Sequence, residues 1–286
     1  MSKESYPSLL RSPKDKVLIG LDIGGSTTKV IGFKHGDLLE EAFVQASDPV
    51  ASAYGALGKF LTLNHLRLEE VDSIHMTGVG ASYLDGRLLE CQTTVVPEFD
   101  SVGLGGLHTA RVGKAIVVSM GTGTSLVYAE QRHVRHIIGS GIGGGTLLGL
   151  AQIMLNVRDF QSISSMAIHG DLGRVDLAVS DISRYEIPGL APETTASNFG
   201  RVDDHYKPED LAMGITNLVF QPIGTAAVLA ARLENVDTVV FTGNLLRVPS
   251  GRQVLYEFSN MYGINVLIPD HAEFATAIGA ALYEPV

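Results

Sequence analysis

The segment 17–30 constrains the fold most, because an apolar strand there delivers one carboxylate, Asp22, into a tight turn. Gly24 and Gly25 lack a Cβ, which lets the backbone turn sharply and bring N–H groups close to phosphate oxygens. Hydroxyl side chains and one cation follow, in the order Ser26, Thr27, Thr28 and Lys29. Mg2+ prefers oxygen ligands, so Asp22 is placed to orient this ion or its water shell. The segment predicts a hairpin that holds a metal-bound phosphate, and its alternative is an ordinary β-hairpin turn.

A second strand and turn repeat this chemistry further along the chain. The apolar strand Lys114–Met120 leads into a run that again combines glycines with hydroxyls, namely Gly121, Thr122, Gly123, Thr124 and Ser125. The spacing is not that of a P-loop, because the sequence contains no Gly-x4-Gly-Lys-[Ser/Thr]. Two such hairpins are therefore suited to face each other across one nucleotide.

Two more glycine segments follow. Residues 139–146 are glycine-rich and precede a helical pattern, which predicts free N–H groups and a positive helix end for a phosphate. The same cluster satisfies Gly-x-Gly-x-x-Gly, but as a dinucleotide fingerprint it is weak because the βαβ context is not evident. Residues 238–244 form a strand that ends in glycine and is suited to face adenosine.

The order of these elements resembles that of the sugar kinase, heat-shock 70 and actin superfamily. Within it, the chain is similar to type II pantothenate kinases through six blocks in matching order, 96–100, 119–126, 143–146, 169–171, 196–200 (Ala-Ser-Asn-Phe-Gly) and 243–247. The resemblance covers residues 17–282. It implies an α/β protein with a two-lobed actin-like ATPase fold and ribonuclease H-like lobes, residues 16–108 and 109–286, with ATP in the cleft between the lobes.

The resemblance also implies a reaction, the ATP-dependent phosphorylation of pantothenate to 4'-phosphopantothenate at the start of coenzyme A biosynthesis. Such a transfer needs in-line positioning, neutralised phosphate charges and an acceptor for the proton of the nucleophile. By resemblance, Glu98 is this catalytic base. By position alone, Glu98 is more simply explained as a solvated acid in the first turn of a helix.

The cofactors implied are ATP and Mg2+, with Asp22 as the metal residue. The phosphates are expected to meet the first two turns, at Asp22, Ile23, Gly24, Gly25, Ser26, Thr27, Thr28, Lys29 and Thr122. The ribose and base are expected to meet the later segments, at Gly143, Gly144, Gly145, Thr146, Leu147, Phe160 and Asn244. Two of these residues have open alternatives, because Lys29 also reads as an edge-strand lysine that points to solvent and Phe160 as plain core.

The expected pantothenate contacts are Glu98, Thr122, Ser125 and His136, and the last departs from the family. In type II pantothenate kinases an arginine at the position of His136 binds the substrate carboxylate. The neighbouring Arg135 can take this role only if the strand register slips by one, because successive strand residues face opposite sides. Histidine offers fewer donors than arginine and is largely neutral near pH 7, so pantothenate is bound less tightly or the substrate differs.

Two other functions stay open. The first is a kinase of the same fold that acts on another hydroxylated compound, such as a sugar or a pantothenate-like amide. The second is a non-catalytic nucleotide-binding regulator, against which Glu98 argues, because a sensor needs no base.

Composition agrees with a cytoplasmic enzyme. The 286 residues carry a net charge of -10 without a Lys/Arg cluster, which argues against a nucleic-acid partner. No apolar run is expected to approach the length of a membrane span, and residues 1–16 are polar with two prolines, unlike a signal sequence. The one cysteine, Cys91, is interpreted as a packing residue.

The secondary structure expected around these motifs is α/β. Strands are predicted at 17–33, 38–44 and 71–77, hairpins at 116–138, and helices at 49–61, 99–107 and 208–233. The last helix carries small and apolar residues on most of its surface, so part of it should pack against another element. By resemblance, this helix forms a twofold homodimer.

Overall fold

The computed structural model describes residues 16–45, 48–84, 86–185, 187–202 and 204–284. Its contacts group the chain into two compact units. Unit 1 takes in the chain up to Gly113, Ala129–His136 and the stretch from Asp270 onward, and unit 2 is Lys114–Tyr128 with Ile137–Pro269. Neither unit is one contiguous segment, whereas each of the two predicted lobes, 16–108 and 109–286, is contiguous. The predicted polar N-terminal segment lies outside the described residues, except for Lys16.

Unit 1 is built on a sheet with the order β3-β2-β1-β5-β7-β6, and β4 pairs with β2. Its strands are β1 Val17–Ile23, β2 Thr27–Lys34, β3 Asp37–Leu38, β4 Ala42–Gln45, β5 Val71–Thr77, β6 Arg87–Leu88 and β7 Cys91–Val95. Its α-helices are α1 Pro49–Leu63, α2 Glu98–Ala110 and α8 Ala275–Leu282. β1 is antiparallel to β2 and parallel to β5.

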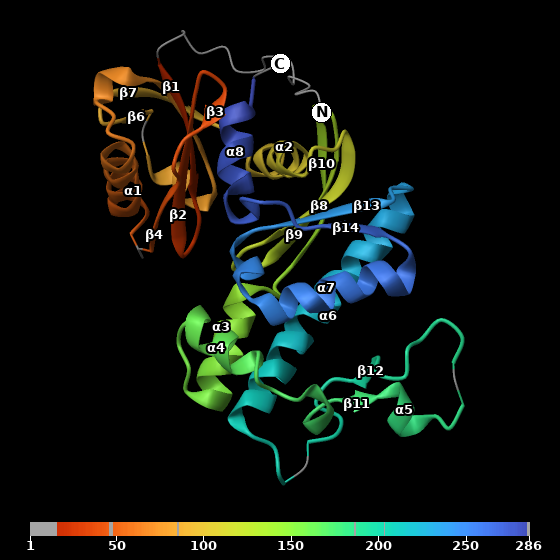
Figure 1. The fold of residues 1–286 in the computed structure, drawn as a ribbon. Helices are drawn as coiled ribbons and strands as arrows, with labels where there is room; N and C mark the ends of the chain where they lie inside the picture. The colour runs from red at the N-terminus through yellow and green to blue at the C-terminus, as the bar shows by residue number, and fades with distance from the viewer. Residues whose placement is uncertain (1–15, 46–47, 85, 186, 203, 285–286) are drawn as a thin grey trace. The chain divides into compact units, whose positions relative to one another are not determined.

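The two faces of β1 are covered by different helices, because successive residues alternate between them. Ile19, Leu21 and Ile23 are fully buried in a core that includes Phe60 of α1. Leu18 lies in a second core with Ala277 of α8. Figure 1 shows α1 and α8 on opposite sides of these strands.

Helices α2 and α8 cross with their backbones in direct contact. A Cβ on Gly105 would lie 1.8 Å from the carbonyl oxygen of Ala275, and a Cβ on Gly279 would lie 1.8 Å from that of Ser101. Figure 1 shows the two helices next to each other, pointing in different directions. Since no side chain fits between them, this crossing fixes the position of α2 and of Glu98 in its first turn.

Unit 2 is built on a sheet with the order β10-β9-β8-β13-β14, whose β9 and β10 extend into the part grouped with unit 1. These strands are β8 Lys114–Met120, β9 Thr124–Glu130, β10 His133–Ser140, β13 Thr238–Thr242 and β14 Asn265–Leu267. A two-stranded sheet pairs β11 Leu177–Ala178 with β12 Thr195–Ser197. The α-helices are α3 Gly144–Leu155, α4 Phe160–Ala167, α5 Val179–Ile182, α6 Pro208–Glu234 and α7 Pro249–Tyr262.

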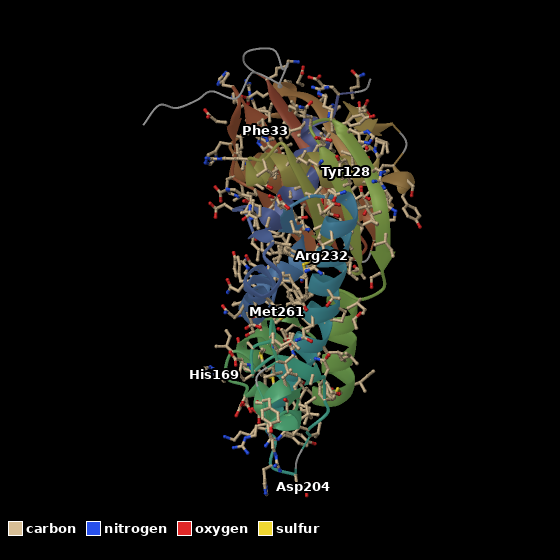
Figure 2. All side chains as sticks on the ribbon, turned by 90° about the vertical axis from the view of Figure 1, so that its right-hand side faces the viewer. Phe33, Tyr128, His169, Asp204, Arg232 and Met261 are labelled. Carbon is tan, nitrogen blue, oxygen red and sulfur yellow. The ribbon has the colours of Figure 1, made fainter. Side chains whose placement is uncertain are left out.

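The long helix α6 confirms the prediction at 208–233 and packs inside unit 2. It begins where Asp210 accepts a hydrogen bond from the N–H of Lys207 at 2.8 Å. Near its end, the guanidinium of Arg232 lies 5.5 Å from the ring centre of Tyr262 on α7, and Figure 2 shows Arg232 on this helix. By length and composition α6 could cross a membrane, so the expectation of no such run is wrong, but 67% of its apolar window is buried.

Most of the other predicted elements are confirmed. The helices at 49–61 and 99–107 correspond to α1 and α2, and the strand at 71–77 is β5, parallel to β1. The continuous strand predicted at 38–44 is wrong, because it is interrupted between β3 and β4. There the backbone of Glu40 pairs with the side chain of Asn64, which donates to its carbonyl at 2.8 Å and accepts from its N–H at 3.0 Å.

Candidate active site

The first predicted turn is a tight hairpin between β1 and β2. The N–H of Gly24 donates to the carbonyl of Thr27 at 3.0 Å, which leaves Gly25 and Ser26 exposed at the tip. The hydroxyl of Thr28 is buried and lies 2.5 Å from that of Ser52 in α1. Of the predicted phosphate contacts, the tip is therefore accessible and Thr28 anchors the hairpin to α1. Ile23 is fully buried, so any nucleotide contact falls to its backbone.

Asp22 and Lys29 face each other across this hairpin. They are partners in the β1–β2 register, and Lys29 Nζ lies 3.9 Å from Asp22 Oδ2. Lys29 is only 8% exposed, so the interpretation as a lysine pointing to solvent is wrong. Burial raises the pKa of the Asp22 carboxyl, and the Lys29 ammonium opposes that rise. The pair places a carboxylate and a cation beside the turn that is predicted to hold phosphate.

The end of β5 closes the other side of Asp22. Thr77 is the register partner of Asp22, and Gly78 follows with φ +89°. A Cβ on Gly78 would lie 2.8 Å from Asp22 Oδ1, so only glycine lets the chain pass this carboxylate. The sequence analysis missed Thr77, although Thr-Gly at the end of a strand predicted to lie beside β1 was a usable signal.

Glu98 begins α2, just after a segment tied to β5 by the Val96 N–H, which donates to the Met76 carbonyl at 2.7 Å. Partial burial raises the pKa of the Glu98 carboxyl, and the nearby charge of Asp22 raises it further. Within the described part of the chain, this carboxylate accepts no hydrogen bond. Glu98 therefore has the properties of a proton acceptor that is held close to the predicted metal residue.

His136 lies at the end of unit 1's portion of β10 and is exposed. Its ring stacks on Phe99, the residue after Glu98, with 4.1 Å between the ring centres and 22° between the planes. The stack covers one face of the imidazole ring, so the ring edge, which carries the nitrogens, is the part available to a substrate. The structure thus brings the predicted carboxylate binder next to the helix that carries Glu98.

Unit 2 brings its own predicted residues together. The N–H groups of Gly144 and Gly145 donate to the carbonyls of Gly121 and Thr122 at 2.8 and 2.9 Å. The expectation of free N–H groups at these two positions is therefore wrong, because they bind α3 to the second hairpin. A Cβ on Gly143 would lie 2.6 Å from the Thr122 carbonyl oxygen, which explains the glycine by close backbone approach.

The other residues predicted to meet adenosine lie near the same cluster. The Phe160 ring is half-buried against Gly144, where a Cβ would lie 2.9 Å from its Cζ. Gly243 has φ +100° and lies so close to β8 that a Cβ would be 2.5 Å from the Met120 carbonyl oxygen. Asn244 follows at the end of β13, while the exposed Thr122 and half-buried Ser125 lie on the second hairpin. Thr146 Oγ1 caps this cluster by donating to the Gly141 carbonyl at 3.0 Å.

In unit 2, one predicted contact is limited to its backbone, and one of the family blocks has a structural role. Leu147 is fully buried, so its side chain is core and only its backbone is left for a nucleotide. The 196–200 block is built around the buried Asp176 carboxylate, which accepts from the Phe199 N–H at 2.8 Å and from Asn198 Nδ2 at 3.1 Å. Asn217 of α6 donates to the same carboxylate at 2.7 Å. This motif therefore anchors β12 to α6.

Solved structures of known proteins show the fold. The activator of 2-hydroxyisocaproyl-CoA dehydratase from Clostridium difficile, with bound ADPNP, is similar with a TM-score of 0.69 at 18% identity, covering 93% of each chain. A ROK hexokinase from Thermus thermophilus is similar with a TM-score of 0.53 at 14% identity, covering 93% of this chain and 97% of that one. These similarities show the fold, and the chain has the two-lobed actin-like ATPase fold.

Sequence comparisons give the family. The family model Fumble matches residues 109–283, and the chain belongs to this family, that of the type II pantothenate kinases. The type II pantothenate kinase of Staphylococcus haemolyticus is 27% identical over 272 residues, 92% of this chain and 98% of that protein. The one from Staphylococcus aureus strain USA300 is 26% identical over 278 residues, 93% of this chain and 99% of that protein.

Proposed function

We propose that this chain is a cytoplasmic pantothenate kinase that transfers the γ-phosphoryl group of ATP to the primary hydroxyl of pantothenate in coenzyme A biosynthesis. The observation that carries the proposal is Glu98, whose raised carboxyl pKa and place beside Asp22 suit a general base. The relatives named above are type II pantothenate kinases over almost the whole chain. Glu98 takes the proton of the attacking hydroxyl as its oxygen bonds to the γ-phosphorus, while the bond from that phosphorus to the bridging oxygen breaks and ADP leaves.

The other residues position and neutralise charge. The exposed tip of the first hairpin and Lys29 serve the phosphates, and the cluster around Phe160 and Asn244 serves the ribose and base. The hairpin through Thr122 and Ser125 contacts both ATP and pantothenate. In a loose phosphoryl-transfer transition state, such positioning and charge neutralisation supply most of the catalysis.

Mg2+ fits this arrangement through Asp22. Among the described residues there is no cluster of three or more His, Cys, Asp or Glu side chains for an all-protein cage. Mg2+ in kinases is usually held by one or two carboxylates together with the phosphates and several waters. Asp22, beside the predicted phosphate turn, would be that carboxylate. When bound, the ion would supply positive charge that neutralises the phosphates.

An ATP-consumption assay with pantothenate, pantetheine and a panel of sugars tests the function. Turnover with pantothenate supports the proposal. Turnover only with a sugar or with an amide lacking the carboxylate would establish a kinase of the same fold with another substrate. ATP binding without consumption on any of these compounds would instead identify a nucleotide-binding regulator.

His136→Arg tests substrate recognition. If His136 faces the pantothenate carboxylate, a guanidinium there can form a charge-assisted, bidentate pair. We expect KM for pantothenate to fall by an amount equivalent to about 1 to 3 kcal/mol, with little change in kcat. Steady-state kinetics over a range of pantothenate concentrations measure this.

Pantetheine is the matched control for this variant, because it lacks the carboxylate. Its KM should be nearly the same for both proteins. Equal decreases in KM for the two substrates would show that His136 does not meet the carboxylate.

We also propose a homodimer through the outer face of α6. Most of this helix is internal to unit 2, but Leu229 and Leu233, one turn apart on one face, are 61% and 73% exposed. Light scattering should give twice the chain mass of 30.5 kDa. Leu229→Asp should give the monomer mass, whereas Ile153→Asp, at an apolar site on α3 that is 81% exposed, should leave the dimer intact. A monomer mass for the unmodified protein at micromolar concentration would reject the dimer.

A further inference from the structure

The buried hydroxyl of Thr77 has no role in the mechanism above. Thr77 ends β5 and is 0% exposed. Within the residues that the structure describes, its Oγ1 has no hydrogen-bond partner. Buried hydroxyls are nearly always paired, because leaving one unpaired costs free energy, so this atom requires an explanation.

Thr77 lies at the end of the unit 1 sheet where the predicted metal residue, Asp22, is found. β1 and β5 are parallel with Asp22 opposite Thr77, so both side chains extend from the same face of the sheet. Lys29 is opposite Asp22 on the other side. The three side chains form one row across β2, β1 and β5, one pleat beyond Gly20, where α8 touches this face. The unpaired hydroxyl is thus the third member of a row whose other two members are charged.

Unit 2 also has a strand that ends in threonine followed by a glycine of positive φ, but there the threonine hydroxyl has a hydrogen-bond partner. β13 ends at Thr242, and Gly243 follows with φ +100°, just as Gly78 follows Thr77 with φ +89°. Thr242 Oγ1 donates to the Val118 carbonyl at 3.3 Å. The two strand ends therefore differ in one respect, which is that the hydroxyl is used by the fold in unit 2 and is left unused in unit 1.

We infer that Thr77 belongs to the nucleotide site and that its hydroxyl accepts a hydrogen bond from a water molecule in the Mg2+ shell. This inference rests on the proposed function, in which Asp22 orients Mg2+. Protein-bound Mg2+ keeps several of its waters, and a carboxylate beside a hydroxyl offers two acceptors for the two protons of one water. Thr77 is then a positioning residue, which holds the ion through its water.

Thr77→Val tests the inference, because it removes the hydroxyl with little change of volume. Thermal unfolding is measured for the protein alone, with ADP in EDTA, and with ADP over a Mg2+ titration. We expect the protein alone to unfold at the same temperature or about 2 °C higher, since an unpaired hydroxyl is lost. ADP without metal should stabilise the variant as it does the unmodified protein. The Mg2+ concentration for half of the additional stabilisation should rise about tenfold, and Thr77→Ser should restore it.

Thr93→Val is the matched control. The Thr93 Oγ1 on β7 is also buried and unpaired among the described residues, but Thr93 is opposite Ile74, which belongs to the core on the α1 side. Its Mg2+ titration should be unchanged. An unchanged titration for Thr77→Val, an equal change for Thr93→Val, or a clearly lower unfolding temperature of ligand-free Thr77→Val would overturn the inference. No pantothenate is present, so a protein that proves inactive on pantothenate leaves this test intact.

Discussion

Replacing Glu98 with glutamine is expected to lower kcat by about 100-fold or more, the usual contribution of a positioned general base. Glutamine nearly preserves the size of the side chain but cannot accept the proton of the attacking hydroxyl. The KM for ATP should barely change, because Glu98 is not among the residues assigned to the nucleotide. Steady-state kinetics with pantothenate measure both quantities.

The pH profile separates a base from a structural acid. Partial burial and the charge of Asp22 raise the Glu98 pKa above its ordinary value of 4.5. A base acts only when ionised, so kcat should fall as the pH is lowered through that raised pKa, and Glu98→Gln should lose this acid limb. Asp100→Asn, which changes another acid in the first turn of α2, should keep normal turnover and the limb. Near-normal turnover in Glu98→Gln would show that Glu98 is not the base and is instead a solvated acid in the first turn of α2.

The sequence predicts the elements around the site well, because strong local signals mark them. The apolar strand before Asp22, the glycine turns and the proline at the start of α6 each fix a backbone conformation within a few residues. The family blocks then supply the order in which these elements follow one another. Local signals of this kind explain why α1, α2, β5 and α6 are found close to their predicted bounds.

What could not be predicted depends on contacts between distant segments. At the break between β3 and β4, the backbone of Glu40 pairs with the side chain of Asn64, which is 24 residues away. The occupied N–H groups of Gly144 and Gly145 depend on where the second hairpin lies. The stack of His136 on Phe99 likewise joins β10 to α2. Periodicity and turn chemistry along the chain contain no information about such pairings.

The contact of α2 with α8 is the clearest of these long-range features. It holds in place the helix that carries Glu98 in its first turn. Gly279 belongs to the last helix and Ser101 to the helix that begins at Glu98, 178 residues earlier along the chain. Their backbones approach so closely that the Cβ of an alanine at 279 would lie 1.8 Å from the Ser101 carbonyl oxygen and 2.6 Å from the Gly105 nitrogen. Both neighbours are backbone atoms, so no side chain can rotate away to relieve the clash.

Gly279→Ala is therefore expected to destabilise the protein by about 3 kcal/mol, the upper range for overpacking a close-packed interior. Urea unfolding of the ligand-free protein measures the change. Gly55→Ala in α1 is the matched control, because a Cβ there meets nothing within 4 Å. That substitution should stabilise the protein by about 0.5 to 1 kcal/mol, since alanine is the better helix former. Because relief of the clash moves α2, Gly279→Ala should also lower kcat more than it changes the KM for ATP. Equal stability of the two variants would mean that the helices separate without cost, and α2 would then not be held in place by this crossing.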